Sequence, residues 1–157
     1  QFPVEAVATM SNVAEEVESD PTYRQILEAS RQVDVPSIAD GIVAAARNIA
    51  ETTDIKAICC FTHTGSTARK IARERPRVPI LALTPFMPTA RTLTLHWGVN
   101  CYQTRSLDRF KMAVVEAASR ARHAGFATES DQIVVMAGVP FNTPGSTNIL
   151  RIAPCAE

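Results

Sequence analysis

Residues 55–67 read Ile55-Lys56-Ala57-Ile58-Cys59-Cys60-Phe61-Thr62-His63-Thr64-Gly65-Ser66-Thr67, and this stretch decides the fold. Its first seven residues are almost wholly apolar, as in strands that are buried on both faces of a sheet. Hydroxyl-bearing residues and a glycine follow, and a helical pattern runs from Gly65 to about Glu74. The stretch therefore predicts a buried strand, a tight turn and a helix, which is the repeating unit of a parallel α/β sheet.

The same alternation of helices and apolar strands continues on both sides of this unit. Upstream, apolar periodicity predicts helices over residues 3–18 and 36–53, separated by a break at Asp20-Pro21 and a polar stretch. Downstream, the pattern predicts helices over residues 89–96 and 107–124 and strands over residues 80–84, 99–104, 132–138 and 148–154. Right-handed crossovers then give a three-layer α/β/α sandwich. Its five-stranded, mostly parallel sheet has the order 3-2-1-4-5, with strand 5 antiparallel.

In this strand order the chain reverses direction between the first and the fourth strand. Open α/β sheets bind ligands beyond the carboxyl ends of the two strands at such a switch point. The loops that follow these strands are residues 62–67 and residues 139–147. We therefore expect both loops to line one ligand site.

The first loop combines the groups that suit a phosphate. Its residues are Thr62, His63, Thr64, Gly65, Ser66 and Thr67, and the facing loop adds Gly145 and Ser146. Unpaired amides and the positive dipole end at a helix N-terminus attract an anion, and hydroxyls add hydrogen bonds. The turn matches neither the Walker P-loop nor the GxGxxG dinucleotide motif. An alternative stays open, in which Thr64 or Ser66 only caps the helix.

Charge and composition argue against several other classes of protein. Basic and acidic residues number 16 each and are interleaved, so there is no basic stripe for nucleic acid. No apolar run reaches the roughly 20 residues of a membrane helix and no signal peptide is seen, so we expect a cytoplasmic protein that binds no membrane. The four cysteines lack CxxC spacing, which favours packed thiols over disulfides or a metal site. His63 has no acidic neighbour in the sequence to orient it as a general base, so we expect no catalytic centre.

Several motifs taken together resemble the C-terminal domain of pyruvate kinase. They are the run from Phe61 to Arg69, the run from Ala72 to Ile80, and Pro144-Gly145-Ser146-Thr147-Asn148 before the final strand. The segment Phe2-Pro3-Val4-Glu5-Ala6-Val7 is similar to the last helix of that enzyme's catalytic barrel. The resemblance covers essentially the whole chain. It implies that residues 1–20 are this barrel helix with a linker and that residues 21–157 are the C-terminal α/β domain; because the chain begins at Gln1, we expect a piece of a longer protein.

The resemblance implies a regulatory role for the chain. Pyruvate kinases transfer phosphate between phosphoenolpyruvate and ADP with magnesium and often potassium, in a barrel and lid that this chain lacks. No catalytic residue and no cofactor is therefore expected here. In the family, the C-terminal domain hosts a phosphorylated allosteric effector and supplies a subunit interface of a homotetramer. The effector phosphate loop maps onto residues 62–67 and the closing loop onto residues 139–146.

One departure from the family pattern bears on the effector. Forms activated by fructose 1,6-bisphosphate carry a tryptophan and an arginine before or within the penultimate long helix, and residues 105–117 lack the tryptophan. A sugar monophosphate or AMP is therefore expected rather than a bisphosphate. Two alternatives stay open: a purely structural subunit-interface domain, and a free-standing small-molecule-binding protein of the same fold.

Overall fold

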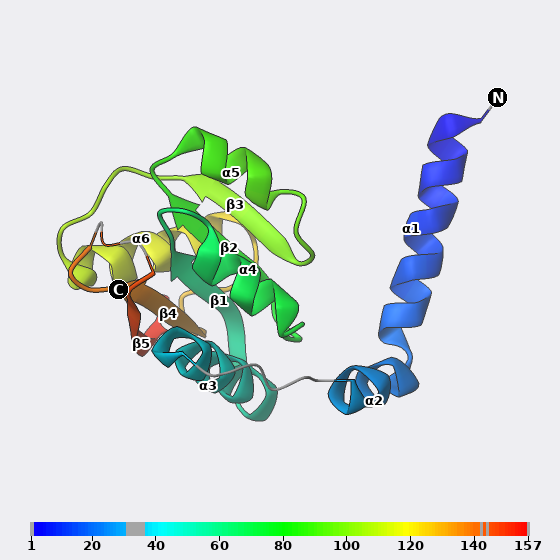
Figure 1. The fold of residues 1–157 in the computed structure, drawn as a ribbon, viewed down its shortest axis with the longest axis horizontal. Coiled ribbons are helices and arrows are strands. Elements are labelled where there is room, and N and C mark those ends of the chain that lie inside the picture. Colours follow the sequence, from blue (N-terminus) through cyan, green and yellow to red (C-terminus); the bar gives the residue numbers. More distant parts are fainter. Residues whose placement is uncertain (1, 31–36, 142, 144, 157) are drawn as a thin grey trace. The chain divides into compact units, whose positions relative to one another are not determined.

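The chain forms two compact units, Gln1–Val35 and Pro36–Glu157 (Figure 1). The computed structural model describes residues 2–30, 37–141, 143 and 145–156. The division that the sequence predicts falls after residue 20, whereas the structure also assigns the next segment to the first unit. Residue 36, where the sequence places the start of the second predicted helix, lies outside the described residues.

The first unit consists of two helices, α1 (Pro3–Ser19) and α2 (Pro21–Ala29). The sequence predicts the first helix and the break at Asp20-Pro21, and both are present, but it predicts no helix in the polar stretch that follows, where the structure has α2. Asp20 accepts a hydrogen bond from the Thr22 amide at 2.7 Å, and Pro21 occupies the first helical position. Because an acidic cap followed by proline starts a helix as readily as it interrupts one, the Asp20-Pro21 pair is the N-terminus of α2.

The second unit is built on one sheet with the strand order β3-β2-β1-β4-β5, as the sequence predicts. The strands are β1 (Ile55–Phe61), β2 (Ile80–Thr84), β3 (Val99–Gln103), β4 (Gln132–Gly138) and β5 (Thr147–Pro154). All neighbouring pairs are parallel except β4 and β5, which are antiparallel. The three central strands are nearly all buried, which is why their sequences are continuous apolar runs rather than alternating ones.

Helices cover both faces of this sheet (Figure 1). On one face, α3 (Ile38–Thr52), α4 (Ser66–Arg73) and Leu93 of α5 (Met87–Leu93) pack on β-strand residues such as Ile58 and Met136. On the other face, α6 (Phe110–His123) packs on residues such as Cys59 and Val135. The described part of the chain contains no helix that is long and apolar enough to span a membrane.

The register of the central strands determines where the loops lie. Cys60 of β1 pairs with Met136 of β4 and with Ala82 of β2, so the three strands end at one edge of the sheet. Phe61 ends β1, and Gly138 ends β4. The segments that follow these strands therefore meet at this carboxyl edge, where the sequence predicts the site.

Candidate functional site

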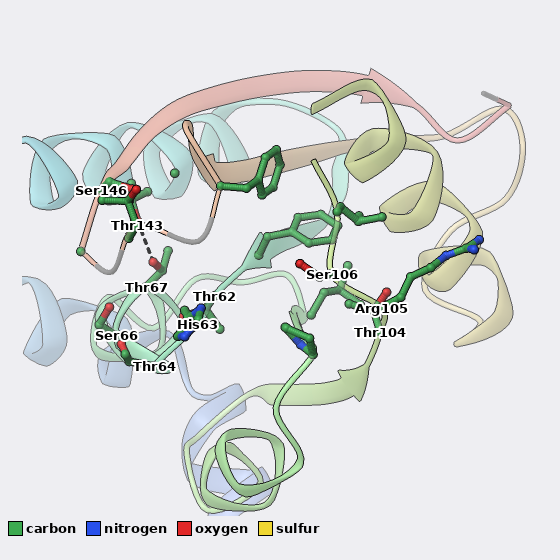
Figure 2. A pocket seen from close by; sticks show the side chains of 18 residues that line it. Thr62, His63, Thr64, Ser66, Thr67, Thr104, Arg105, Ser106, Thr143 and Ser146 are labelled. Carbon is green, nitrogen blue, oxygen red and sulfur yellow. Dashed lines mark hydrogen bonds between the residues drawn. The ribbon is translucent and has the colours of Figure 1, made fainter. Parts of the chain in front are cut away.

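The carboxyl edge of the sheet carries a cavity that both predicted loops line (Figure 2). The cavity has a volume of about 60 Å³ and opens to solvent. Of the eight predicted residues, all but one line it: Thr62, His63, Thr64, Ser66, Thr67, Gly145 and Ser146. The exception is Gly65, which forms the N-cap of α4.

The N-terminus of α4 has no side-chain cap. Its N-cap residue is Gly65, with φ of 83°, and no side chain forms a capping hydrogen bond there. The alternative in which Thr64 or Ser66 caps the helix is therefore wrong for this structure. The Gly65 amide instead donates to the Thr62 hydroxyl at 3.0 Å, which closes the turn before the helix starts. The first amides of α4 thus receive no acceptor from a capping side chain, as an anion-binding helix end requires.

Two features make glycine necessary at position 65. Its left-handed φ disfavours other residues, and the space beside it is already filled. A Cβ atom built there would lie 2.9 Å from Arg69 Nη1 and 3.1 Å from Leu93 Cδ2. Arg69 is held in this position because its Nη1 donates to the Thr64 carbonyl at 3.1 Å.

Three buried threonines form the inner wall of the cavity. Thr62, Thr67 and Thr147 are only 7, 5 and 6% exposed, and the hydroxyls of Thr67 and Thr147 lie 2.6 Å apart. Each hydroxyl has one hydrogen to donate. Thr62 accepts a hydrogen bond, and the Thr67–Thr147 pair uses one hydrogen of two. Within the described residues, this wall therefore retains hydroxyl hydrogens that an acceptor in the cavity can use.

Asn148 fixes the start of the second predicted loop at Val139 through two hydrogen bonds. Its side chain accepts from the Val139 amide at 2.9 Å and donates to the Val139 carbonyl at 2.6 Å. Between Val139 and Asn148, the Ser146 hydroxyl donates a hydrogen bond to the Thr143 carbonyl at 2.7 Å. Gly138, at the end of β4, allows Ser146 to lie close to it, because a Cβ atom at position 138 would lie 3.0 Å from the Ser146 backbone. Residues 142 and 144, which belong to the predicted closing loop and motif, lie outside the described residues.

His63 is placed by packing rather than by an acidic partner. Its ring lies against Phe86 with centroids 4.1 Å apart, and its carbonyl accepts a hydrogen bond from Thr89 at 3.1 Å. Within the part of the chain that the structure describes, His63 forms no ion pair.

Charge is scarce around the cavity. Arg105 is the cationic side chain among its described lining residues, and none of these residues is acidic. Figure 2 shows the Arg105 side chain pointing away from the loop of residues 62–67. The described residues also contain no group of three His, Cys, Asp or Glu side chains that could hold a metal ion. The groups that face a ligand are therefore mainly hydroxyls, backbone amides and apolar side chains.

One side of this cavity has no recognisable signal in the sequence. The segment after β3 contributes Thr104 to Leu107, and the end of β2 contributes Leu83 and Pro85. Phe61 and Phe141 also line the cavity, as an edge-to-face pair with centroids 6.5 Å apart. The strand order alone could have placed these residues near the site, because β2 and β3 end at the same edge as β1. No local sequence motif distinguishes them from core residues.

Comparison with known proteins identifies the family. The family described as the pyruvate kinase alpha/beta domain matches residues 40–153. A pyruvate kinase of Methylorubrum extorquens is 43% identical over 152 residues, which are 97% of this chain and 32% of that protein. A pyruvate kinase of Agrobacterium vitis is 43% identical over 151 residues, which are 96% of this chain and 32% of that protein.

A solved structure supports the same relationship. The structure of Cryptosporidium parvum pyruvate kinase in complex with ADP superposes with a TM-score of 0.81 at 29% identity, covering 99% of this chain and 31% of that one. This chain thus spans about a third of the length of the relatives that it matches. The family match over residues 40–153 and the shared fold thus show that the chain belongs to the pyruvate kinase alpha/beta domain family.

Proposed function

We propose that this chain is the C-terminal regulatory and oligomerisation domain of a pyruvate kinase and that it binds a phosphorylated effector in the cavity at the carboxyl edge. The observation that carries the proposal is the meeting of residues 62–67 with residues 145–147 in one cavity, over an α4 N-terminus without a side-chain cap. The parent reaction is then phosphate transfer between phosphoenolpyruvate and ADP, and the setting is glycolysis in the cytoplasm.

The donors at this site suit phosphate oxygens. Amides at the start of α4 and the positive end of its dipole favour an anion. The buried hydroxyls of Thr62, Thr67 and Thr147 supply donors, and no acidic side chain among the described lining residues would repel the ligand. A phosphate monoester offers only acceptors when it is fully ionised, so it can use each of these donors.

The scarcity of cations favours a single phosphate. A bisphosphate needs a second anion-binding pole, and Arg105 is the one arginine or lysine among the described lining residues that could supply it. A sugar monophosphate or AMP therefore fits the cavity better than fructose 1,6-bisphosphate. Magnesium and potassium belong with the catalytic part of the parent enzyme rather than with this unit.

The regulatory part of the proposal requires two states. A ligand shifts a conformational equilibrium only if it binds one state more tightly than the other. Gly145 and Ser146 are the candidate moving residues, because they line the cavity while Asn148 holds the base of their loop through Val139. Closure of this loop would then alter packing at a neighbouring subunit of a homotetramer.

The first helix supports the link to a catalytic barrel. The α1 residues Val4, Val7, Met10, Val13 and Val17 are all more than half exposed, and they recur at helical spacing. An apolar stripe of this kind normally packs on a partner surface. We propose that residues 1–20 are the last helix of the catalytic barrel and its linker.

Titration of the chain with inorganic phosphate, glucose 6-phosphate and AMP tests the effector site. We expect amide resonances of residues 64–67 to shift and the melting temperature to rise. Replacement of Thr67 by valine should weaken binding, whereas Thr52→Val, the same change on the exposed end of α3, should not. The absence of any response at millimolar ligand would overturn the proposed effector site.

A further inference from the structure

Thr147 lines the cavity but is not among the eight residues that the sequence predicts for the anion site. It is the first residue of β5, and it pairs with Gly138 of the neighbouring strand β4. Gly145 and Ser146 precede the strand and belong to the loop. The backbone of Thr147 is therefore held by the sheet, whatever position these two loop residues take.

The hydroxyls of Thr147 and Thr67 meet at the inner end of the cavity. Both residues are buried, and their hydroxyl oxygens lie 2.6 Å apart. Figure 2 shows this hydrogen bond as a dashed line that runs from Thr67. Thr67 lies in the first turn of α4, which is packed on the sheet through Ala68 and Ile71. The distance between the two oxygens is thus set by two packed elements rather than by the loop.

The hydrogens of this pair can be assigned once an anion occupies the cavity. Each hydroxyl carries one hydrogen, and either oxygen can be the donor when no ligand is present. A fully ionised phosphate monoester offers only acceptors at the α4 N-terminus, so it takes the hydrogen of Thr67, the hydroxyl that α4 itself carries there. Thr67 then has no hydrogen left for its neighbour. Thr147 must therefore donate to the Thr67 oxygen.

We infer that Thr147 is a positioning residue of the anion site: it donates to Thr67, and Thr67 in turn donates to the phosphate of the ligand. This inference rests on the proposed function and adds a residue that acts on the ligand only through another. The bond from Thr147 turns the remaining hydrogen of Thr67 toward the ligand. It also polarises the Thr67 hydroxyl, which strengthens the next hydrogen bond in the chain.

A double-mutant cycle on Thr67 and Thr147 tests the inference. The full chain and its variants are titrated calorimetrically with glucose 6-phosphate and with AMP at pH 8, where both phosphates are dianions. We expect Thr67→Val to weaken binding about tenfold, because a hydrogen bond to a charged group is lost. Thr147→Val should weaken binding by about threefold, since only the support of that bond is lost. In the Thr67→Val background, Thr147→Val should have no further effect.

Three controls separate positioning from a general effect on folding. Thr147→Ser keeps the hydroxyl and should bind like the unmodified chain. Gly125→Ala lies outside the cavity at a left-handed φ of 73°, so it should lower stability and leave the affinity unchanged. If Thr147→Val does not fold, Thr147→Ala takes its place in the cycle.

A measurement on the unmodified chain needs no variant. Because the hydrogen-bond chain ends in β5, we expect the amide resonances of Ile149 and Leu150 to shift together with those of residues 64–67 when ligand is added. Both residues lie beyond the cavity lining, in β5. Shifts confined to residues 64–67 would contradict the inference.

The outcomes distinguish this inference from the proposal beneath it. Unchanged affinity in Thr147→Val, or weak binding in Thr147→Ser, would overturn the positioning role and leave the phosphate site standing. Additive losses in the double variant would also overturn it, because Thr147 would then contact the ligand directly. Failure of both ligands to bind the unmodified chain would overturn the proposed function as well.

Discussion

Thr67 and Thr147 are separated by 80 positions in the sequence, yet their hydroxyl oxygens lie 2.6 Å apart at the inner end of the cavity. Thr67 belongs to the first turn of α4, and Thr147 is the first residue of β5. Their hydrogen bond therefore joins the loop of residues 62–67 directly to the end of the facing loop. A ligand that forms a hydrogen bond with either hydroxyl therefore affects both loops.

Loss of one of these two hydroxyls should destabilise the domain. In Thr67→Val the shape of the side chain is kept, but the Thr147 hydroxyl is left buried without its partner. We expect a decrease of about 1–3 kcal/mol in the free energy of unfolding, measured by urea denaturation. The double variant Thr67→Val/Thr147→Val should lose less than the sum of the single variants, because neither hydroxyl is then unpaired. Simple additivity would show that the pair is not coupled.

Replacement of Gly65 by alanine should cost more than replacement of Gly125. Both glycines have a left-handed φ, 83° and 73°, which costs an L-residue about 1–2 kcal/mol. A Cβ atom at Gly65 would also crowd Arg69 and Leu93, whereas one at Gly125 has nothing within 4 Å. The matched Gly125→Ala variant thus measures the backbone cost alone. Equal losses in thermal or urea unfolding would show that the crowding at position 65 is relieved without cost.

The stability contributed by Asp40 should depend on pH. Lys70 donates to Asp40 Oδ1 at 2.6 Å, and the Ser37 hydroxyl and amide donate to Oδ2 at 2.5 and 3.1 Å. These hydrogen bonds hold the pKa of Asp40 well below its ordinary value. The bond from Lys70 has the largest effect, followed by the bonds from Ser37. A lowered pKa in the folded state stabilises the fold above the unfolded-state pKa of about 3.9, and this stabilisation is lost as the pH falls toward the folded-state value.

We therefore expect Asp40→Asn to lower the free energy of unfolding by about 1 kcal/mol at pH 7, as loss of a capping interaction does. The difference from the unmodified chain should stay constant between pH 8 and pH 5 and shrink at pH 3. Asp54→Asn serves as the control, because Asp54 also pairs with a lysine but its side chain is 87% exposed. A difference that persists undiminished at pH 3 would contradict this origin of the stability.

Thiol reactivity should single out Cys101. Cys59, Cys60 and Cys155 are buried, and burial raises the pKa of each of these thiols above its ordinary value. The pKa of Cys101 is also raised by burial, but this side chain is partly exposed. Since the thiolate is the reactive form and needs access, we expect one slowly reacting thiol in the native chain at pH 8 and four in urea. Mass spectrometry after labelling would identify it, and Cys101→Ser should abolish the native reaction.

The sheet was predictable because its local signals agree with its tertiary environment. The runs at Ile55–Phe61 and Gln132–Gly138 are apolar at nearly every position, since both faces of these strands are covered. Connection rules then order the strands. The start of α2 was missed because Asp20-Pro21 has the same composition whether it ends one helix or begins another, and only the capping bond to Thr22 distinguishes the two.

The site was predictable only in part. Residues 62–67 carry their own signal, because hydroxyls, a glycine and a helix start occur together in the chain. Phe141 and Leu107 carry none, since apolar side chains in loops do not indicate which cavity they line. Whether Thr64 caps α4 was also undecided by the sequence, because capping depends on where a side chain points.

The sequence by itself determined the layers, the strand order and the position of the loop of residues 62–67, because periodicity and turn chemistry act within a few residues of one another. Only the tertiary structure decided what faces that loop. It brought the Thr147 hydroxyl against Thr67 and placed Phe61 beside Phe141, because parallel β1 and β4 end, and antiparallel β5 begins, at one edge of the sheet whatever their distance in sequence.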